Sequence, residues 1–428
     1  MAKNVFVLGI DDFNLEQLEA IRNADRYRFQ ALFGFDEVKG GGRYPFDELL
    51  AGAQERLNRF DGPIDAICGY WDFPVTSIVP ILCRQYGTPG PSVESVAKCE
   101  HKYWSRREQA KAVPELAPRY SAVNPFVDDP LAGVELDFPF WLKPVKGTDS
   151  LLGFKIRHER DFRNAIDIIR ENIGHITGPF DRFLSHVQLP EDIAHVDGSY
   201  CIAEELMSGR QCTVSGYVHR GEVTVYGVVD SVNYPKSSSF FRYQYPSHLP
   251  KRVKERLAAG SKRIMEHIGY DQAAFNIEYF YDERHDRISL LEINPRISQS
   301  HGHLYQQVDG SPNHQIMVEL ALGRRPEFPY REGGYGVAAE FHLRRFEDAV
   351  VTRIPSGEEV REIEQNIPGT IIDIKVDRCT HLSEMIEQDS YSFDIAHVFM
   401  GARDQHQLLE NYRRCVDSLR FEFADQDC

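Results

Sequence analysis

The sequence predicts a protein of the α/β and α+β classes, with a small parallel α/β domain first and a small β-rich domain last. Two observations lead to this prediction. Over the first ninety or so residues, strand-like and helix-like runs alternate, which is typical of a parallel sheet with helices on its faces. From about Gly333 onward, strand-like runs dominate. The chain has 428 residues and 42% hydrophobic content, which is enough for two or three domains.

The first domain is expected to contain three buried strands, VFVLGI, RFQALFGF and IDAICGYW. Helices are expected at residues 15–24, 46–60 and 76–86. The turn after the first strand reads GIDDFN and lacks the GxGxxG pattern that brings the backbone close to a pyrophosphate. This argues against a nicotinamide dinucleotide domain.

Glycine and proline in GTPGPS mark the first domain boundary, and the composition changes again near residue 330. We therefore divide the sequence into domains 1–95, 96–330 and 331–428, and the middle domain into 96–200 and 201–330. The middle domain is expected to begin with a polar helix at 98–112 that stops at VPELAPR. The last domain contains the strand-like runs GVAAEFHLRR, VTRIPS, TIIDIKV and 391–401, then a helix at 405–419.

Composition excludes several classes of partner and location. The net charge of −16 argues against general affinity for nucleic acid or anionic membranes. No run of about 18 apolar residues is present, so we expect no membrane span. Asp11 and Asp12 interrupt the apolar N-terminal run, which indicates a buried strand and not an export signal. The eight cysteines form no CxxC pair, so we expect free buried thiols and a cytoplasmic location.

The segment AAFNIEYFYDERHDRISLLEINPRISQSH, residues 273–301, reads as a β-hairpin with a polar loop. If the hairpin is centred near His285, Glu278 and Glu292 are directly opposite, with Cβ atoms about 5 Å apart. Asn294 then lies on the same face. Two such carboxylates repel each other unless a cation lies between them, and Mg²⁺ suits these ligands, with Mn²⁺ as the alternative. A solvent-exposed acidic pair is the structural alternative.

The run LLEINPR favours the metal site over that alternative. It embeds Glu292 between apolar residues, where an unpaired charge is costly. The Asn-Pro step then ends the strand and directs Arg296 from its tip.

A second candidate element is FWLKPVKGTDSLLG, in which an apolar strand leads into a small polar loop. Lys143 at the end of this strand is a candidate phosphate ligand, and backbone N–H groups of Gly147, Thr148 and Ser150 are candidate further donors. An ordinary strand lysine beside a turn remains the alternative. The chain has no GxxxxGK[ST] motif, which excludes a Walker-type loop.

A third candidate element is YCIAEELMSGRQCTVSGYV, in which a strand delivers Glu204 and Glu205 to a turn. Glu204 is a candidate acceptor for the exocyclic amine of adenine, while backbone groups near Leu206 and Met207 read the ring edge. Gln211 would then reach the ribose. Solvated carboxylates at a strand end are the alternative.

In this order of elements the sequence resembles the ATP-grasp enzymes. The resemblance covers roughly residues 92–326. It rests on four ordered motifs: CEHKYWSRREQAKAVPELAPR with Lys102, FWLKPVKGTDS with Lys143, AEELMSGRQCTV with Glu204, and FNIEYFY followed by LLEINPRIS. The first domain then looks like the α/β domain that precedes the ATP-grasp fold. The last hundred residues look like the small β-rich domain of members organised like biotin carboxylase or amino-acid ligases.

The resemblance implies a role for each matching residue. Lys102 and Lys143 would contact the ATP phosphates, and Glu204 would read adenine. The metal ligands would be Glu278, Glu292 and Asn294, and Arg296 would stabilise a reacting acyl phosphate. Many members have a glutamate where this chain has Gln211, but an amide can still bond a ribose hydroxyl.

The resemblance also implies a reaction. A stand-alone ligase would use ATP to activate a small carboxylate as an acyl phosphate and would then join it to an amine, such as an amino acid. Biotin carboxylases have an acidic residue four positions after the conserved arginine, whereas this chain has Ser300. A carboxylase or kinase of the same fold and a non-catalytic nucleotide-binding regulator are the alternatives.

Substrate contacts are expected in two places. The segment 233–250, NYPKSSSFFRYQYPSHLP, is rich in polar residues and is expected to be irregular, either as a substrate loop that uses Lys236 or Arg242 or as a solvated connection. Ser300 is a further candidate substrate residue, and His301 and His303, just past the hairpin, would line the acceptor pocket. The pair formed by His301 and His303 suggests zinc, but no cysteine or acidic partner stands at ligand spacing. The expected partners are a small carboxylate and an amine, and a homodimer is an open alternative.

Overall fold

The computed structural model describes residues 2–39, 44–147, 152–385 and 392–424. Residues 1–226, 250–299 and 314–327 form one compact unit, unit 1. Residues 227–249, 300–313 and 328–428 form a second, unit 2. The division into three domains made from the sequence stays a prediction.

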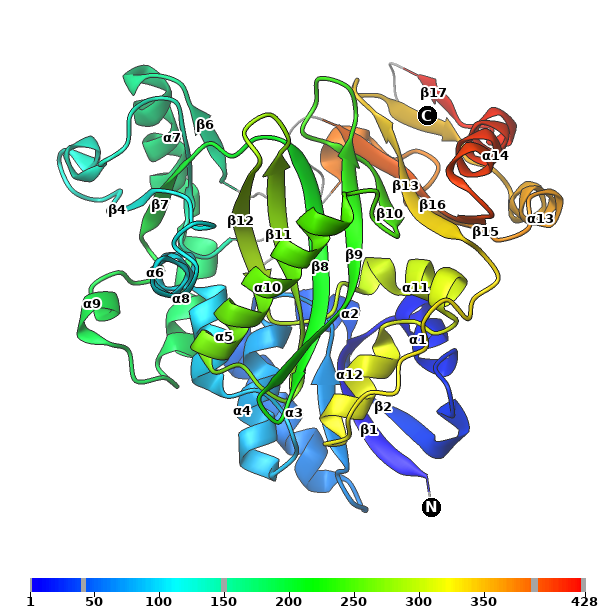
Figure 1. Cartoon of the computed structure of the whole chain (residues 1–428), viewed down its shortest axis with the longest axis horizontal. Helices are drawn as coiled ribbons and strands as arrows, with labels where there is room; N and C mark the ends of the chain where they lie inside the picture. Colours follow the sequence, from blue (N-terminus) through cyan, green and yellow to red (C-terminus); the bar gives the residue numbers. More distant parts are fainter. Residues whose placement is uncertain (1, 40–43, 148–151, 386–391, 425–428) are drawn as a thin grey trace. The chain divides into compact units, whose positions relative to one another are not determined.

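Unit 1 begins with the predicted parallel sheet. Strands β1 (Lys3–Ile10), β2 (Tyr27–Gly34) and β3 (Ala66–Gly69) are arranged in the order β2-β1-β3, and both pairs are parallel (Figure 1). Helix α1 (Asp12–Glu19) begins earlier than predicted because the Asp11 side chain caps it, accepting the Asn14 N–H at 2.8 Å. The remaining helices of this region are α2 (Phe35–Lys39), α3 (Phe46–Arg59) and α4 (Val75–Tyr86).

The predicted polar helix at 98–112 is wrong, because two helices occupy this region. They are α5 (Val93–Glu100) and α6 (Lys102–Ala112). His101 separates them and caps α6, since its Nδ1 accepts the Trp104 N–H at 3.2 Å. Its Nε2 lies 2.8 Å from the Val196 carbonyl oxygen, so both ring nitrogens are used. The break follows from this cap.

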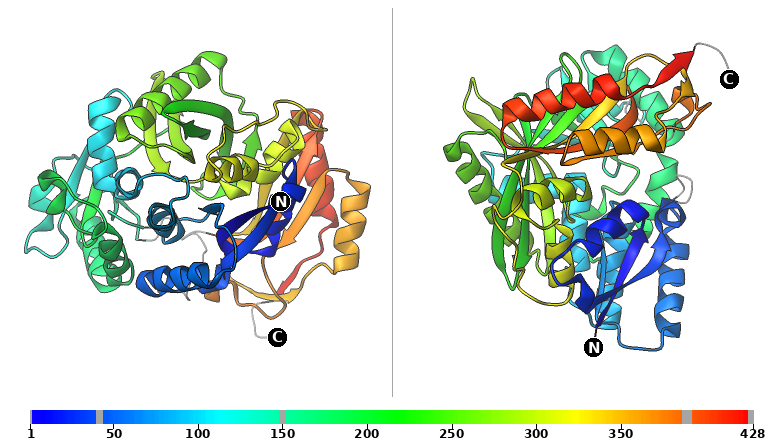
Figure 2. Two further views of the ribbon diagram at one scale, coloured as in Figure 1. Left: turned by 90° about the horizontal axis from the view of Figure 1, so that it is seen from below. Right: turned by 90° about the vertical axis from the view of Figure 1, so that its right-hand side faces the viewer.

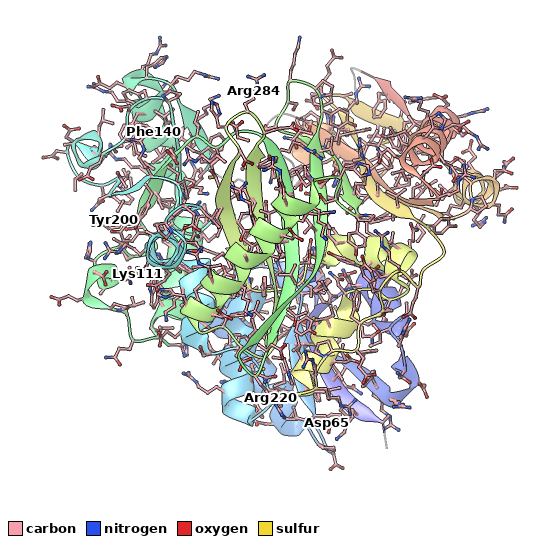
Figure 3. All side chains as sticks on the ribbon, in the orientation of Figure 1. Asp65, Lys111, Phe140, Tyr200, Arg220 and Arg284 are labelled. Carbon is pink, nitrogen blue, oxygen red and sulfur yellow. The ribbon has the colours of Figure 1, made fainter. Side chains whose placement is uncertain are left out.

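An antiparallel sheet comes next in unit 1, with strand order β4-β7-β5-β6. Its strands are β4 (Tyr120–Val123), β5 (Phe140–Pro144), β6 (Phe154–Ile156) and β7 (Cys201–Glu205). Figure 3 marks its place with Phe140 and Tyr200. Helix α7 (Glu159–Asn172) packs its apolar face, including Phe162, Ile166 and Ile169, onto this sheet. The helices α8 (Gly174–Leu184) and α9 (Glu191–Ala194) follow.

The predicted hairpin lies in unit 1 as β11 (Ala273–Asp282) and β12 (Arg287–Asn294). Arg284 marks the tip of this hairpin in Figure 3. Strand β8 (Arg210–His219) pairs antiparallel with β11 on its other side. Helix α10 (Lys251–Ile268) lies across these strands in Figure 1, and its Ser261 hydroxyl is 2.8 Å from the Tyr279 hydroxyl. The buried helix α12 (His314–Ala321) completes unit 1.

Unit 2 is rich in β-structure, and its residues 337–424 contain most of the strands expected in the last part of the chain. Strand β9 (Glu222–Asn233) begins in unit 1 and continues into unit 2. After it, β10 (Phe240–Tyr245), β13 (Val337–Arg345), β16 (Phe393–Ala402) and β15 (Thr370–Ile374) pair antiparallel in that order. The expectation of an irregular segment at 233–250 is therefore wrong, because residues 240–245 form a strand. Its aromatic residues have strand propensity, which outweighs the polar composition.

Two helices cover one face of this sheet in unit 2. They are α13 (Gly357–Asn366) and α14 (Gln405–Ser418), and the right-hand view of Figure 2 shows both on the same side of the strands. Ile363, Leu408 and Tyr412 pack there against Phe341 and Val398. The other elements are α11 (Gly302–Asp309) and the strand pair β14 (Val350–Arg353) with β17 (Glu422–Ala424).

Six cysteines of the described ranges are free and buried, as predicted: Cys68, Cys83, Cys99, Cys201, Cys212 and Cys415. Cys379 is disulfide-bonded, so the expectation of free thiols is wrong at this residue. Within the described residues, every helix is too short or too polar to span a lipid bilayer.

Candidate functional site

The central feature of unit 1 is the pair of carboxylates on the β11–β12 hairpin. Glu278 and Glu292 are register partners, as predicted from the spacing around the loop. The Asn294 amide donates to Oε1 of Glu278 at 3.2 Å, so Asn294 lies on the same face. The Gln211 amide donates to the other oxygen, Oε2, at 2.9 Å. Strands β8, β11 and β12 thus place two carboxylates and two amides together.

The two carboxylates have opposite electrostatic environments. Burial and the nearby Glu292 raise the pKa of Glu278. Burial also raises the pKa of Glu292, but Lys102 and Lys143 outweigh this effect and lower it to about 2. Glu292 is therefore compensated by ammonium groups, whereas amide groups bond Glu278. Carboxylate oxygens are the ligands that Mg²⁺ prefers, and the excess negative charge at Glu278 favours a bound cation.

Three lysines surround this pair. The Lys102 ammonium lies 2.9 Å from Oε1 of Glu292 and donates to the Gly147 carbonyl oxygen at 3.0 Å. Lys143 lies 2.8 Å from Oε2 of Glu204. Lys146 is ion-paired with Glu100 and also contributes to the low pKa of Glu292. Sequence reasoning missed Lys146, although it is the second lysine of KPVKG.

Glu204 is buried, with only 1% of its surface exposed. Its Oε1 accepts from Nε of Arg106 at 2.6 Å, while Oε2 contacts Lys143. Arg106 also donates to the Leu290 and Leu291 carbonyl oxygens at 3.1 and 2.6 Å. Arg106 thereby connects α6, β7 and β12. The sequence analysis missed it; its position one turn after Lys102 on the same helix is the available signal.

Most of the other residues predicted to bind the nucleotide lie at or just after the end of β7. Glu205 is ion-paired with Arg287 and with Arg119, the latter at 3.3 Å. Leu206 and Met207 are half-buried in the segment after β7. Gln211 bonds Glu278, as described above. Of the predicted phosphate loop, Gly147 is described, whereas Thr148 and Ser150 lie outside the described residues.

Arg296 forms a two-point ion pair with Asp72. Nε of Arg296 donates to Oδ1 at 2.7 Å and Nη2 to Oδ2 at 2.6 Å. Burial lowers the pKa of the guanidinium, but Asp72 more than compensates and raises it. Asp72 follows β3 of the parallel sheet. Sequence reasoning missed this residue; the signal was its place beyond the carboxyl end of a parallel strand, where ligands gather in α/β sheets.

The predicted substrate residues belong to unit 2. Lys236 lies exposed in the turn before β10. The guanidinium of Arg242 donates from Nε to Oε1 of Gln244 at 2.9 Å. Ser300 is half-buried, whereas His301 is buried with its ring 5.2 Å from that of Tyr243. Their proposed roles stay predictions.

Sequence comparisons identify the class of domain that contains the hairpin carboxylates. A family model described as an ATP-grasp domain matches residues 136–302. The chain is 27% identical over 244 residues to the uncharacterized protein y4rH of Sinorhizobium fredii, covering 56% of this chain and 43% of that protein. It is 19% identical over 337 residues to urea amidolyase of Saccharomyces cerevisiae, covering 77% of this chain and 17% of the enzyme. The chain thus spans less than half the length of these relatives.

Solved structures with similar folds cover almost the whole chain. An L-amino acid ligase from Bacillus licheniformis has a TM-score of 0.71 at 13% identity, with 99% of both chains covered. A phosphoribosylglycinamide synthetase from Anaerococcus prevotii has a TM-score of 0.66 at 12% identity, covering 99% of this chain and 100% of that one. The biotin carboxylase domain of Hydrogenobacter thermophilus 2-oxoglutarate carboxylase, complexed with MgADP, ADP and bicarbonate, has a TM-score of 0.65 at 15% identity, covering 99% and 91%. The chain therefore has the ATP-grasp fold, and the predicted resemblance is confirmed.

Proposed function

We propose that the protein is an ATP-dependent ligase that activates a small carboxylate as an acyl phosphate and joins it to an amine, such as an amino acid. ATP-grasp proteins are generally ATP-dependent ligases. The L-amino acid ligase whose fold is similar over 99% of this chain supports the proposal.

One observation carries the proposal. Unit 1 brings the carboxylates Glu278 and Glu292 together with three lysines and the guanidinium of Arg296. The charges of Lys102, Lys143 and Lys146 lower the pKa of Glu292, and Arg296 acts electrostatically on Glu278. A cluster of four cations around two carboxylates suits a reaction in which negative charge develops on transferred phosphate.

Each group has a distinct task in this proposal. Lys102 and Lys143 bind the ATP phosphates, and Glu204 with the segment at Leu206 and Met207 binds adenine. Glu278, Glu292 and Asn294 hold Mg²⁺, which would neutralise phosphate charge when bound. Arg296 orients and stabilises the acyl phosphate. Phosphoryl transfer depends mainly on positioning and charge neutralisation, so no separate side-chain base is required.

The test is turnover of the purified chain with ATP, Mg²⁺ and pools of small carboxylates and amino acids. ADP and phosphate release and the product masses are measured together. An amide product with stoichiometric phosphate release is expected. A phosphorylated or carboxylated product would replace the ligase proposal with a kinase or carboxylase. The absence of turnover over a broad panel, with ATP binding retained, would favour a regulator.

A further inference from the structure

A second group of metal-ligand side chains lies in unit 2, on the neighbouring strands β13 and β16. We propose that Glu340, His342 and His397 form a binding site for a divalent transition-metal ion of the zinc type. One ligand atom from each residue lies within 4.8 Å of the other two. The proposal does not rest on the ATP-dependent reaction, because all of these residues belong to unit 2.

Strand geometry explains why these three side chains meet. His342 and His397 are register partners in the antiparallel pair, so they project to the same face. Their ring centroids are 4.6 Å apart. Glu340 lies two residues before His342 on β13, and alternate residues of a strand share a face.

Two ligand atoms of this cluster are buried without a hydrogen bond. Among the residues that the structure describes, Oε2 of Glu340 and Nε2 of His342 have no hydrogen-bond partner. Glu340 is 1% exposed and His342 is 6% exposed. A buried polar atom without a hydrogen-bond partner destabilises the folded protein. A metal ion bound by both atoms would remove this destabilisation.

Asp394 holds both imidazoles in the orientation that metal binding requires. Its Oδ2 lies 2.9 Å from Nδ1 of His342 and 3.0 Å from Nε2 of His397. A proton on each of these nitrogens leaves Nε2 of His342 and Nδ1 of His397 as the ligand atoms. Carboxylates that accept from the second nitrogen of a ligating histidine fix its tautomer and raise its basicity.

A β-bulge places Asp394 on this face. Leu343 pairs with Ala396, but the next residue, Arg344, pairs with Asp394, so Ile395 is the extra residue on β16. In a regular strand, Asp394 and His397 would lie on opposite faces because they are three residues apart. The bulge redirects the carboxylate toward the histidines. Arg344 then contacts the same oxygen at 2.9 Å and balances its charge.

The donor set determines the class of metal. Two imidazoles and one carboxylate match zinc and iron(II) sites, whereas Mg²⁺ prefers oxygen ligands alone. Three protein ligands also leave a position for water or a small ligand. The competing arrangement is a proton on His397, since Nδ1 of this ring lies 3.1 Å from Oε1 of Glu340. Zinc and that proton require the same nitrogen, so measurement of metal binding distinguishes the two.

The experiment uses the untagged, chelator-treated full chain in excess Mg²⁺, which saturates oxygen-only sites. Zn²⁺ binding is titrated by calorimetry, and Co²⁺ serves as a spectroscopic probe. We expect one Zn²⁺ per chain and visible absorption of four- or five-coordinate Co²⁺. His342→Gln and His397→Gln should each weaken binding at least 100-fold, and Asp394→Asn should weaken it about 10- to 100-fold. His406→Gln, an exposed histidine on α14, is the matched control and should bind normally.

The wild-type protein decides the question even if a cluster variant fails to fold. A wild-type chain that binds less than one Zn²⁺, and whose Co²⁺ complex shows only the weak spectrum of hydrated ion, overturns the site. Equal Zn²⁺ affinity in wild type and in a folded His342→Gln variant also overturns it. Loss of Zn²⁺ binding in both histidine variants, with unchanged circular dichroism, supports it.

Discussion

At the residue scale, the facing carboxylates Glu278 and Glu292 show how different surroundings shift the pKa of two identical side chains in opposite directions. Lys102 contacts Glu292 directly, whereas amides bond Glu278. We expect Glu292→Gln to reduce ATP-dependent phosphate release by about 100-fold or more, because it removes a proposed metal ligand and the partner of Lys102. Glu283→Gln, in the exposed loop of the same hairpin, is the control. Near-normal phosphate release by Glu292→Gln would contradict the assigned site.

Replacement of Glu278 should have opposite effects on stability and on activity. Its pKa is raised by burial and by Glu292, so its ionised form destabilises the metal-free protein at neutral pH. Glu278→Gln should therefore raise the unfolding temperature in chelator while abolishing most phosphate release. Thermal unfolding and the turnover assay measure the two quantities. A lower unfolding temperature than wild type would show that repulsion is not the dominant effect at this position.

His101 makes stability depend on acid pH. Burial lowers the pKa of this imidazole to about 4, below its ordinary value of 6.5. The unfolded chain therefore takes up a proton first, and stability falls as the pH decreases from about 6.5 to 4. The full loss is about 3 kcal/mol. His101→Asn retains a cap acceptor for α6 but cannot titrate, so its free energy of unfolding should change less over this range.

Urea unfolding at several pH values measures this difference. His406→Asn, at an exposed position, should retain the wild-type dependence. An identical pH profile in wild type and His101→Asn would assign the acid sensitivity to other groups.

At the element scale, the turn into β8 depends on the close approach of Gly209 to the hairpin. Gly209 has φ of +113°, and an added Cβ would lie 2.2 Å from the Tyr281 carbonyl oxygen. We expect Gly209→Ala to destabilise the protein by about 2–4 kcal/mol. Gly221→Ala is a matched control, because Gly221 also has positive φ, +78°, but no atom lies within 4 Å of the added Cβ. It should cost about 1 kcal/mol. Similar losses in denaturant unfolding would contradict the steric explanation.

The elements that depend on residues close together in the chain were predictable from the sequence. The alternation of apolar residues and the position of the polar loop fixed the pairing of Glu278 with Glu292, because both strands of a hairpin share one loop. The alternation of strand-like and helix-like runs likewise predicted the parallel first sheet, because consecutive parallel strands are joined by helices. Each of these inferences uses neighbours in the chain.

Contacts that join distant segments were not predictable in this way. Arg106 reaches Glu204, and Asp72 reaches Arg296, only after several elements have packed. Glu340 and His397 lie far apart in the sequence and come together only because β13 pairs with β16, so the sequence analysis did not identify this cluster. The bulge at Ile395 has no composition signal, since isoleucine is an ordinary strand residue.

At the scale of the whole molecule, the two proposed ligands should protect different segments. A ligand that binds only the native state suppresses the opening of the structure around it. MgATP should slow amide hydrogen exchange in β7, β11 and β12 of unit 1. Zn²⁺ should slow exchange in β13 and β16 of unit 2. Hydrogen exchange with mass spectrometry measures both effects in one experiment, because peptides from both units are followed together.

Two variants serve as reciprocal controls for this experiment. Glu292→Gln should weaken the protection by MgATP and leave that by Zn²⁺, while His342→Gln should have the reverse effect. Zn²⁺ protection restricted to unit 1 peptides would assign zinc binding to the hairpin carboxylates instead.

The pairing of Asp72 with Arg296 limits how far this protein can be treated as modular. A fragment restricted to the matched segment 136–302 would retain the guanidinium of Arg296 but lose its counterion. It would also lose Lys102 and Arg106, which lie before residue 136. Chimeras that exchange the leading α/β segment must therefore supply a carboxylate at the end of its third strand, or they will leave a buried cation uncompensated.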